Sequence, residues 1–242
     1  MRISRIFVET TLLPNSQISL DDDSCHYVRT VLRLKKNDEL VLFDGSGAEF
    51  SSRLLEINRK QVIVDVLTAH HPQIESPLKI NFGLAVSRSE RMDFAIQKSV
   101  ELGVNQITPL LTERCVVQLK DDKKIQKTRH WQKIARHAAE QCGRIRVPMI
   151  TQVTSLNDWL GLQQGLRIFL DPRAEFTLTQ LTTKPEMVTL LSGPEGGFTE
   201  NERVIAKANG FEGIKLGPRI LRTETAALAA IASVQTLWGD FN

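Results

Sequence analysis

The sequence predicts a two-domain α/β protein, with a small β-barrel over residues 1–72 and a larger α/β domain over residues 73–242. Three observations predict this organisation. Short strand patterns follow one another in the first part of the chain. A stretch with two prolines and two histidines, residues 69–77, then reads as an inter-domain linker. From Leu78 onward strand and helix patterns alternate, which is typical of a parallel sheet covered on both faces.

The first domain is predicted to contain short strands over residues 39–43, 48–57 and 61–66, with Asp44-Gly45 as a turn signal between the first two. A helix precedes these strands. It begins at the run of residues 21–24, whose Asp and Ser side chains can cap its N-terminus. Together these elements favour a barrel with one helix packed on it.

Two stripes distinguish the faces of this helix. The apolar stripe is formed by Val28, Val31 and Leu32. The basic residues His26, Arg29 and Arg33 share the spacing i, i+3 and i+7 on another face. The basic stripe suits contact with phosphate groups, and a solvated surface helix fits this pattern equally well.

The second domain is expected to contain five strands and five helices in alternation. Ser155 is the predicted N-cap of a short helix, Thr199 and Glu202 form a capping box, and Thr223 is the predicted cap of the last helix. The expected strands cover residues 80–86, 106–110, 166–170, 188–192 and 214–216, and the expected helices cover residues 91–102, 123–141, 156–162, 200–210 and 224–237.

The composition excludes several classes of protein. The chain has 242 residues and three cysteines at wide spacing, an odd count that argues against a disulfide framework. Neither CxxC nor HExxH occurs, so no metal site is expected, and His70-His71 reads as a solvated dipeptide. No window is apolar enough for a membrane span, and the N-terminus lacks a signal-peptide core, so a cytoplasmic protein is expected.

The positive charge is concentrated in one segment. The net charge is only +3, but residues 120–146 hold nine Lys or Arg and three Asp or Glu. A local excess of this kind suits phosphate contacts. A solvated helix face is the alternative that the charge count alone leaves open.

The strongest local signal is the segment Ser192–Phe198, which places three glycines around a Pro-Glu pair between a buried strand and a capped helix. Glycine permits a close approach of a ligand to the main chain. The segment is neither GxGxxG nor a P-loop. Its main-chain N–H and C=O groups can bind a flat nucleoside. A tight strand-to-helix turn is the alternative.

A second signal follows the next strand, over residues 216–226. Gly217 and Pro218 form a turn, and Arg222 stands at the entrance of a helix rich in alanine. A cation at a helix N-terminus is unfavourable without an anionic partner, so Arg222 is predicted to meet a phosphate, a carboxylate or a developing oxyanion. A pair with Glu195 or Glu224 is the alternative.

Taken together, these segments resemble the SPOUT superfamily of methyltransferases. Within that superfamily, the chain is similar over essentially its whole length to the bacterial 16S rRNA uridine-N3 methyltransferases, the RsmE family. The residues that carry the resemblance are His26–Arg33, Gln97–Val104, Glu113–Cys115, Glu140–Arg144, Gly193–Gly197 and Leu216–Ala226.

The resemblance implies a PUA-like RNA-binding barrel, a catalytic domain with a trefoil knot, and a homodimer with each cofactor near the subunit interface. General topology rules alone would reject a knot. The implied cofactor is S-adenosylmethionine and the implied partner is 16S rRNA in the small ribosomal subunit. The expected cofactor-binding residues are Leu170, Gly193, Pro194, Glu195, Gly196, Gly197, Leu216, Gly217, Ile220, Leu221 and Arg222.

Loop position then assigns roles in methylation of uridine N3. Arg222 is the first candidate to stabilise negative charge on the uracil oxygens, with Arg114 or Arg88 assisting. Glu224 or water takes the N3 proton. The target base must be unpaired or flipped out. The residues expected to contact RNA are His26, Arg29, Arg33, Arg88, Lys133, Arg136 and Arg144.

Three other functions fit parts of the pattern. One is a non-catalytic RNA-binding or ribosome-assembly protein of the same fold. Another is a SPOUT enzyme that acts on transfer RNA or on a ribose 2′-hydroxyl. A nucleotide-dependent enzyme is disfavoured by the missing P-loop.

Overall fold

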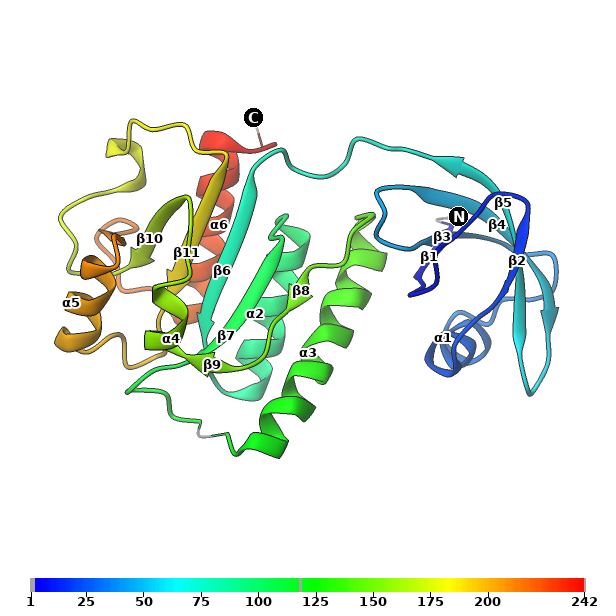
Figure 1. Cartoon of the computed structure of the whole chain (residues 1–242), viewed down its shortest axis with the longest axis horizontal. Helices are drawn as coiled ribbons and strands as arrows, with labels where there is room; N and C mark the ends of the chain where they lie inside the picture. Colours follow the sequence, from blue (N-terminus) through cyan, green and yellow to red (C-terminus); the bar gives the residue numbers. More distant parts are fainter. Residues whose placement is uncertain (1–2, 118, 242) are drawn as a thin grey trace. The chain divides into compact units, whose positions relative to one another are not determined.

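The computed structural model describes residues 3–117 and 119–241, and the chain divides into two compact units (Figure 1). Unit 1 comprises Met1–Glu75 and Ala139–Val147, and unit 2 comprises Ser76–Ala138 and Pro148–Asn242. Residues 139–147 are distant in sequence from the rest of unit 1, an association that no local pattern predicts. None of the described helices combines the length and apolar character needed to cross a lipid bilayer.

Unit 1 contains one five-stranded sheet in the order β1-β3-β4-β5-β2. β1 pairs with β3 in parallel, and the other neighbours are antiparallel. The three predicted strands are confirmed, whereas β1 and β2 are too short for their alternation to predict them. The strands are β1 (Ser4–Phe7), β2 (Ser16–Ser19), β3 (Glu39–Phe43), β4 (Glu49–Ile57) and β5 (Val62–His70).

Alternating side chains of these strands form the core of unit 1. Leu40 and Leu42 of β3 and Val62, Val64 and Val66 of β5 are all buried, as the period of two in a half-buried strand requires. Burial of this apolar face is the main stabilising contribution to a sheet of this size.

The predicted linker begins too early. β5 extends through His70, which pairs with Glu49, and the His70 Nε2 atom lies 2.8 Å from Ser51 Oγ. The register of β4 against β5 shifts at two places, and the pairing continues beyond the predicted strand end at Val66 as far as His70. The prediction that His70 belongs to a solvated linker is therefore wrong.

The helix of unit 1 begins as predicted and ends differently. The Asp21 carboxylate accepts the main-chain N–H of Ser24 at 2.7 Å and caps α1 (Asp22–His26). The next turn, Tyr27–Val31, is a π-helix, in which the Leu32 N–H donates to the Tyr27 carbonyl. A π turn is wider than an α turn, so the predicted 3.6-residue spacing fails.

The predicted stripes on this helix are consequently wrong. Val28 is fully buried, but Val31 is 59% exposed. Arg33 lies beyond the helix in the left-handed region, with φ of 53°. His26, Arg29 and Arg33 therefore do not form one face of a regular helix.

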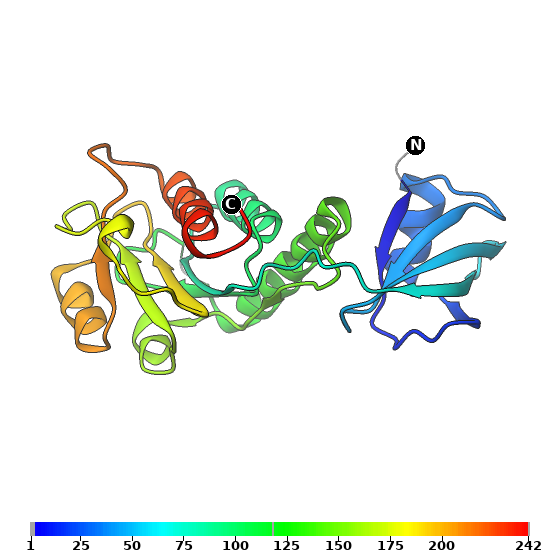
Figure 2. The same ribbon diagram turned by 90° about the horizontal axis from the view of Figure 1, so that it is seen from above.

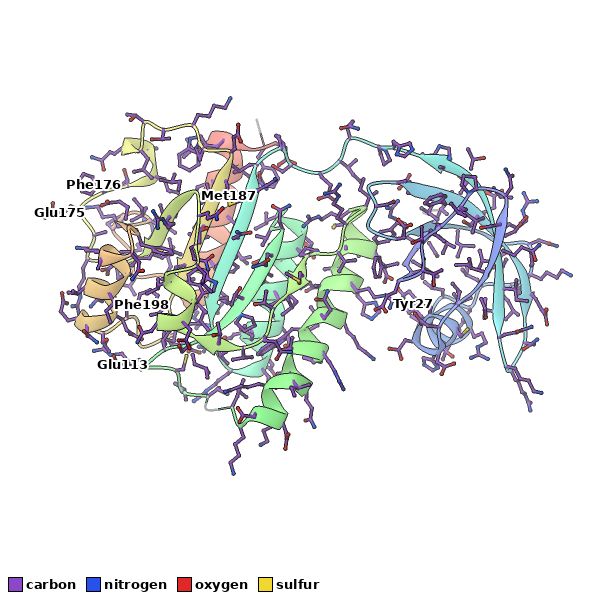
Figure 3. The ribbon with its side chains drawn as sticks, viewed as in Figure 1. Tyr27, Glu113, Glu175, Phe176, Met187 and Phe198 are labelled. Atoms are coloured by element: carbon purple, nitrogen blue, oxygen red, sulfur yellow. The ribbon has the colours of Figure 1, made fainter. Side chains whose placement is uncertain are left out.

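The segment 139–147 is held against the rest of unit 1 by partly buried polar contacts. The Arg144 guanidinium donates from Nε and Nη2 to Glu75 Oε2 at 3.0 and 2.7 Å. The Phe7 N–H donates to Glu140 Oε1 at 3.0 Å. Burial raises the pKa of Tyr27 (labelled in Figure 3), and the negative charge of Glu140 raises it further.

Unit 2 is built on a seven-stranded sheet in which every pair is parallel, as predicted. Its order is β12-β10-β11-β6-β7-β8, and β9 also pairs with β7. The strands are β6 (Lys79–Ala85), β7 (Gln106–Leu111), β8 (Met149–Ile150), β9 (Thr154–Ser155), β10 (Leu166–Leu170), β11 (Met187–Ser192) and β12 (Glu212–Ile214).

Helices cover both faces of this sheet (Figure 2). α2 and α6 contact one another on one face, and α4 and α5 lie on the other. On the α4–α5 face, the core includes Trp159, Phe169, Leu191 and Phe198. The helices are α2 (Ser89–Glu101), α3 (Asp121–Cys142), α4 (Leu156–Leu160), α5 (Glu200–Ala208) and α6 (Thr223–Trp238), with a 3-10 turn at Leu178–Gln180.

Two predicted boundaries in unit 2 are corrected. The strand expected over residues 214–216 is instead Glu212–Ile214, and it ends at Ile214 opposite Leu170, the last residue of its partner β10. Thr223 is the first residue of α6, and Arg222 occupies the N-cap position without a side-chain bond. The predicted caps Ser155 and Thr199 are confirmed.

Candidate functional site

The candidate site lies at the edge of the unit 2 sheet where its parallel strands end. Ligands of open parallel sheets bind beyond this edge. β12 and β11 flank β10, so the turns that follow them leave the sheet on either side of the end of β10, Leu170. Leu170 pairs with Ile214 and is half-buried. The order of the strands thus brings both predicted glycine turns to one edge.

The turn Gly193–Gly197 follows β11 and is closed by a bond from the Gly197 N–H to the Pro194 carbonyl at 2.8 Å. Gly197 has φ of 65°, which favours glycine. A side-chain carbon at Gly193 would lie 3.1 Å from the Phe198 ring. This ring is buried and meets Phe169 edge to face, with centroids 6.0 Å apart. The glycines therefore allow a tight turn that packs against the buried Phe198 ring.

Two arginines from other elements hold this turn. Arg114, in the loop after β7, donates from Nη1 to the Gly196 carbonyl at 3.0 Å. Arg91, in the first turn of α2, pairs with Glu195 at 3.0 Å between Nη1 and Oε1. The structure therefore brings Arg114 to the glycine turn. It assigns Glu195 to Arg91, a residue that the sequence did not single out, and not to Arg222.

The second turn, residues 215–222, is more open. Gly217 has φ of 75°, and no atom lies within 4 Å of a side-chain carbon built there. Ile220 is 87% exposed, Leu216 and Leu221 are half-buried, and Arg222 is exposed. This surface is available for contact with a ligand or another chain.

The charges at the start of α6 lack partners in the described part of the chain. The Arg222 guanidinium makes no hydrogen bond or ion pair among the described residues, so the predicted alternatives of a pair with Glu195 or Glu224 are excluded there. One carboxylate oxygen of Glu224, Oε2, is buried and has no hydrogen-bond partner among these residues. An arginine and a buried carboxylate oxygen without partners, close in sequence at a helix N-terminus, are suited to a ligand.

The candidate RNA-binding residues separate into two groups. Arg88 precedes α2 and is exposed, and Lys133 on α3 is exposed while Arg136 is half-buried. His26 and Arg33 are exposed as well.

Two other candidates, Arg29 and Arg144, are bound to other residues of unit 1. The Arg29 guanidinium donates to the carbonyls of Cys25, Asn58 and Arg59 at 2.8 to 3.1 Å. Arg144 is 6% exposed and pairs with Glu75. These contacts favour structural roles for Arg29 and Arg144.

Sequence reasoning missed two buried tethers behind the site. The Asp171 carboxylate accepts from Arg203 Nε at 2.8 Å and holds the end of β10 against α5. Glu202 Oε1 accepts the Glu113 N–H at 2.9 Å and links α5 to the loop after β7. The capping box identified Glu202 only as a local helix signal, because the partner is 89 residues away.

No metal centre is found among residues 3–117 and 119–241, where no group of three His, Cys, Asp or Glu could hold an ion. The two glycine turns are better suited to an adenosyl group than to a metal ion. At Gly197 and Gly217 the main chain is bare on the side where a side chain would stand. Main chain that is bare in this way allows a nucleoside to approach closely.

Comparison with known proteins assigns both units to described families. The RNA methyltransferase domain family matches residues 74–235, and the RNA methyltransferase PUA domain family matches residues 20–67. A Buchnera aphidicola protein named Ribosomal RNA small subunit methyltransferase E is 42% identical, covering 100% of this chain and 99% of the relative. A Bacillus subtilis protein of the same name is 28% identical, covering 96% of each chain.

Two solved structures share the fold over the whole chain. A Legionella pneumophila protein in complex with the bound cofactor SAM superposes with a TM-score of 0.96 at 37% identity, covering 100% of both chains. A Ribosomal RNA small subunit methyltransferase E from Neisseria gonorrhoeae, bound to S-adenosyl methionine, has a TM-score of 0.94 at 35% identity with the same coverage.

Proposed function

The chain belongs to the ribosomal RNA small subunit methyltransferase E family, and from this premise we propose that it uses S-adenosylmethionine to methylate N3 of a uridine in 16S rRNA. The observation that carries the proposal is the pair of glycine turns at one sheet edge, with bare main chain at Gly197 and Gly217. Relatives bound to the cofactor support the same assignment.

Main-chain groups of Gly193–Gly197 and Leu216–Arg222 would hold the cofactor, with Leu170 at the end of the strand between them. S-adenosylmethionine supplies an electrophilic methyl group on a sulfonium cation. The protein's task is to align N3 of the base with that group and to keep the geometry fixed. Arg114 and Arg91 maintain the shape of the first turn through Gly196 and Glu195.

Proton removal from N3 is the second task, because the neutral uracil ring holds a proton on the atom that must attack. The buried Glu224 Oε2 has no partner among the described residues and is the proposed acceptor of this proton. The negative charge spreads to the uracil oxygens O2 and O4. The planar guanidinium of Arg222 can donate two hydrogen bonds to such oxygens, and Arg114 is the second candidate donor.

RNA is proposed to contact unit 2 through Arg88, Lys133 and Arg136, and unit 1 through His26 and Arg33. N3 lies on the Watson–Crick edge, so the target uridine is unpaired or flipped out. α3 itself carries six Lys or Arg against three Asp or Glu, and this smaller positive excess supports a phosphate-binding surface on the helix.

Salt dependence separates RNA contacts from structural arginines. Lys133→Ala is expected to lower the slope of log K against log salt by about one unit, because one phosphate contact is lost. Arg144→Ala is expected to leave the slope unchanged and to lower the free energy of unfolding by about 3 kcal/mol, because the partly buried Glu75 loses its positively charged partner. Filter binding across a salt series and urea unfolding measure the two effects. An unchanged slope in Lys133→Ala would remove Lys133 from the interface.

Three finer properties of the family are also part of the proposal. The first is a trefoil knot, in which one segment of the chain passes through a loop formed by another. The parallel bridge between Phe176 and Ile214, which brings the segment after β10 alongside β12, supports it. A homodimer is supported by the alanines of α6, whose small side chains permit close packing. Closure of the unit 1 sheet as a PUA-type barrel is supported by the family match over residues 20–67. The proposed rRNA substrate supports a cytoplasmic location.

The function is tested with methyl-labelled S-adenosylmethionine and small ribosomal subunits from cells that lack this protein. We expect one labelled uridine in 16S rRNA, with the methyl group on N3, identified by nuclease digestion and mass spectrometry. Reverse transcription stops at N3-methyluridine, because the Watson–Crick edge is blocked. Label on a ribose 2′-hydroxyl, on another RNA, or on no RNA would contradict the proposal.

A further inference from the structure

Glu202 is more deeply buried and better bonded than a helix cap requires. Its side chain stands in the first turn of α5, and the residue is 4% exposed. Oε2 accepts the Thr199 N–H at 2.8 Å, and Thr199 Oγ1 accepts the Glu202 N–H at 3.2 Å. These two bonds complete the capping box.

The second carboxylate oxygen makes a bond that capping does not need. Glu202 Oε1 accepts the main-chain N–H of Glu113 at 2.9 Å. Glu113 lies in the loop after β7, and Figure 3 labels it together with Phe198, which leads into α5. One buried carboxylate therefore joins the loop after β7 to the helix that follows the glycine turn. Bonds to an ionised acceptor are stronger than neutral ones.

The residue after Glu113 is Arg114, which touches the glycine turn directly. Its Nη1 donates to the Gly196 carbonyl at 3.0 Å. A side-chain carbon at Gly196 would lie 3.1 Å from Arg114 Cβ, so Arg114 packs against the main chain of the turn. The Glu202–Glu113 bond thus fixes the main chain one residue before the arginine that contacts the candidate cofactor turn.

We propose that Glu202 is a positioning residue for methyl transfer, which holds the loop Thr112–Cys115 so that Arg114 stays on the Gly193–Gly197 turn. The inference rests on the proposed function and deepens it. Glu202 itself touches neither the cofactor nor the RNA, and it acts through Arg114. A shift of the loop by a fraction of an ångström is enough to reduce turnover, because alignment of the reacting groups is sensitive to such errors.

The test compares Glu202→Ala with two variants at the same helix end. Glu202→Ala is expected to lower kcat about tenfold and to leave the dissociation constant for S-adenosylmethionine within about threefold. Thr199→Ala removes the other half of the capping box and keeps the Glu202 carboxylate. Glu200→Gln removes a negative charge from the same turn, where the Glu200 side chain is 79% exposed. Both controls are expected to retain kcat, and thermal unfolding verifies that all three variants fold.

A double-mutant cycle tests whether Glu202 acts through Arg114. In an Arg114→Ala background, Glu202→Ala is expected to add less than about a twofold loss, because the group that it positions is already gone. If the losses of kcat in the two single variants multiply in the double variant, the two residues act independently and the proposal is overturned. An equal loss of kcat in Thr199→Ala at matched stability would also overturn it, because that result assigns the effect to the helix cap.

Hydrogen exchange provides a readout that does not depend on methyl transfer. The Glu113 amide is expected to exchange faster in Glu202→Ala than in the wild type or in Glu200→Gln, because it loses its acceptor. Unchanged exchange together with unchanged kcat would refute the role of Glu202. If the wild-type protein transfers no methyl group, the proposed function fails, and the exchange rates still report whether Glu202 holds the loop.

Discussion

Arg222→Ala is expected to lower kcat by about a hundredfold to a thousandfold, the usual effect of removing a donor that stabilises transition-state charge. The guanidinium is exposed at the start of α6 and has no partner among the described residues, so it is available to the uracil oxygens. Because the interaction strengthens as the N3 proton leaves, substrate binding should change little. Steady-state kinetics with saturating RNA gives kcat, and calorimetry gives the dissociation constant for S-adenosylmethionine.

Arg222→Lys is the matched comparison, since lysine keeps the positive charge and loses the planar fork. We expect its kcat to lie between those of the wild type and Arg222→Ala. An equal loss of cofactor affinity and of kcat in Arg222→Ala would contradict the charge-stabilising role and would assign Arg222 to cofactor binding alone.

Gly217→Ala is expected to weaken binding of S-adenosylmethionine by at least about tenfold, because the added carbon occupies the bare side of the main chain where the cofactor is proposed to lie. Among the described residues, none apart from the two chain neighbours of Gly217 stands within 4 Å of that position. The loss of affinity would therefore come from contact with the ligand, and calorimetry with S-adenosylmethionine alone measures it.

Gly143→Ala is the control variant for the backbone strain that alanine introduces at a positive φ. Gly143 follows α3 and also has a positive φ, 92°, with no atom within 4 Å of a built side-chain carbon. Both substitutions should lower the free energy of unfolding by about 1–2 kcal/mol, because alanine disfavours this conformation. Only Gly217→Ala should lose cofactor affinity, and equal affinity in the two variants would remove the second turn from the cofactor site.

Regular patterns were sufficient to predict most of unit 2. Its strands are buried on both faces, and helix signals such as the capping box of Thr199 and Glu202 act within one turn of the chain. The parallel sheet and the position of both glycine turns at one edge follow from this alternation. The sequence therefore predicts where the candidate site lies.

The errors arise where a distant contact or an irregular turn determines the structure. The π turn at Tyr27–Val31 breaks the 3.6-residue spacing and separates Arg33 from Arg29. Arg144 appears in a basic run, but Glu75 buries it in unit 1. The predicted end of the strand at residue 216 fails because its partner β10 ends at Leu170, opposite Ile214. Patterns in the local sequence cannot identify partners that are distant along the chain.

The details of the site depend on pairs that are far apart in sequence. The Arg91–Glu195 ion pair and the Glu202–Glu113 bond each join loops that only the folded sheet brings together. The roles proposed for Arg222, Glu224 and Arg114 remain predictions.

The most direct test of the cofactor site is a crystal structure of this protein determined with S-adenosylmethionine. We predict an adenosyl group bound by the main chain of Gly193–Gly197 and Leu216–Arg222, next to Leu170. A structure in which the protein's own side chains fill the space between these turns, with the cofactor bound elsewhere or excluded, would contradict the proposed site.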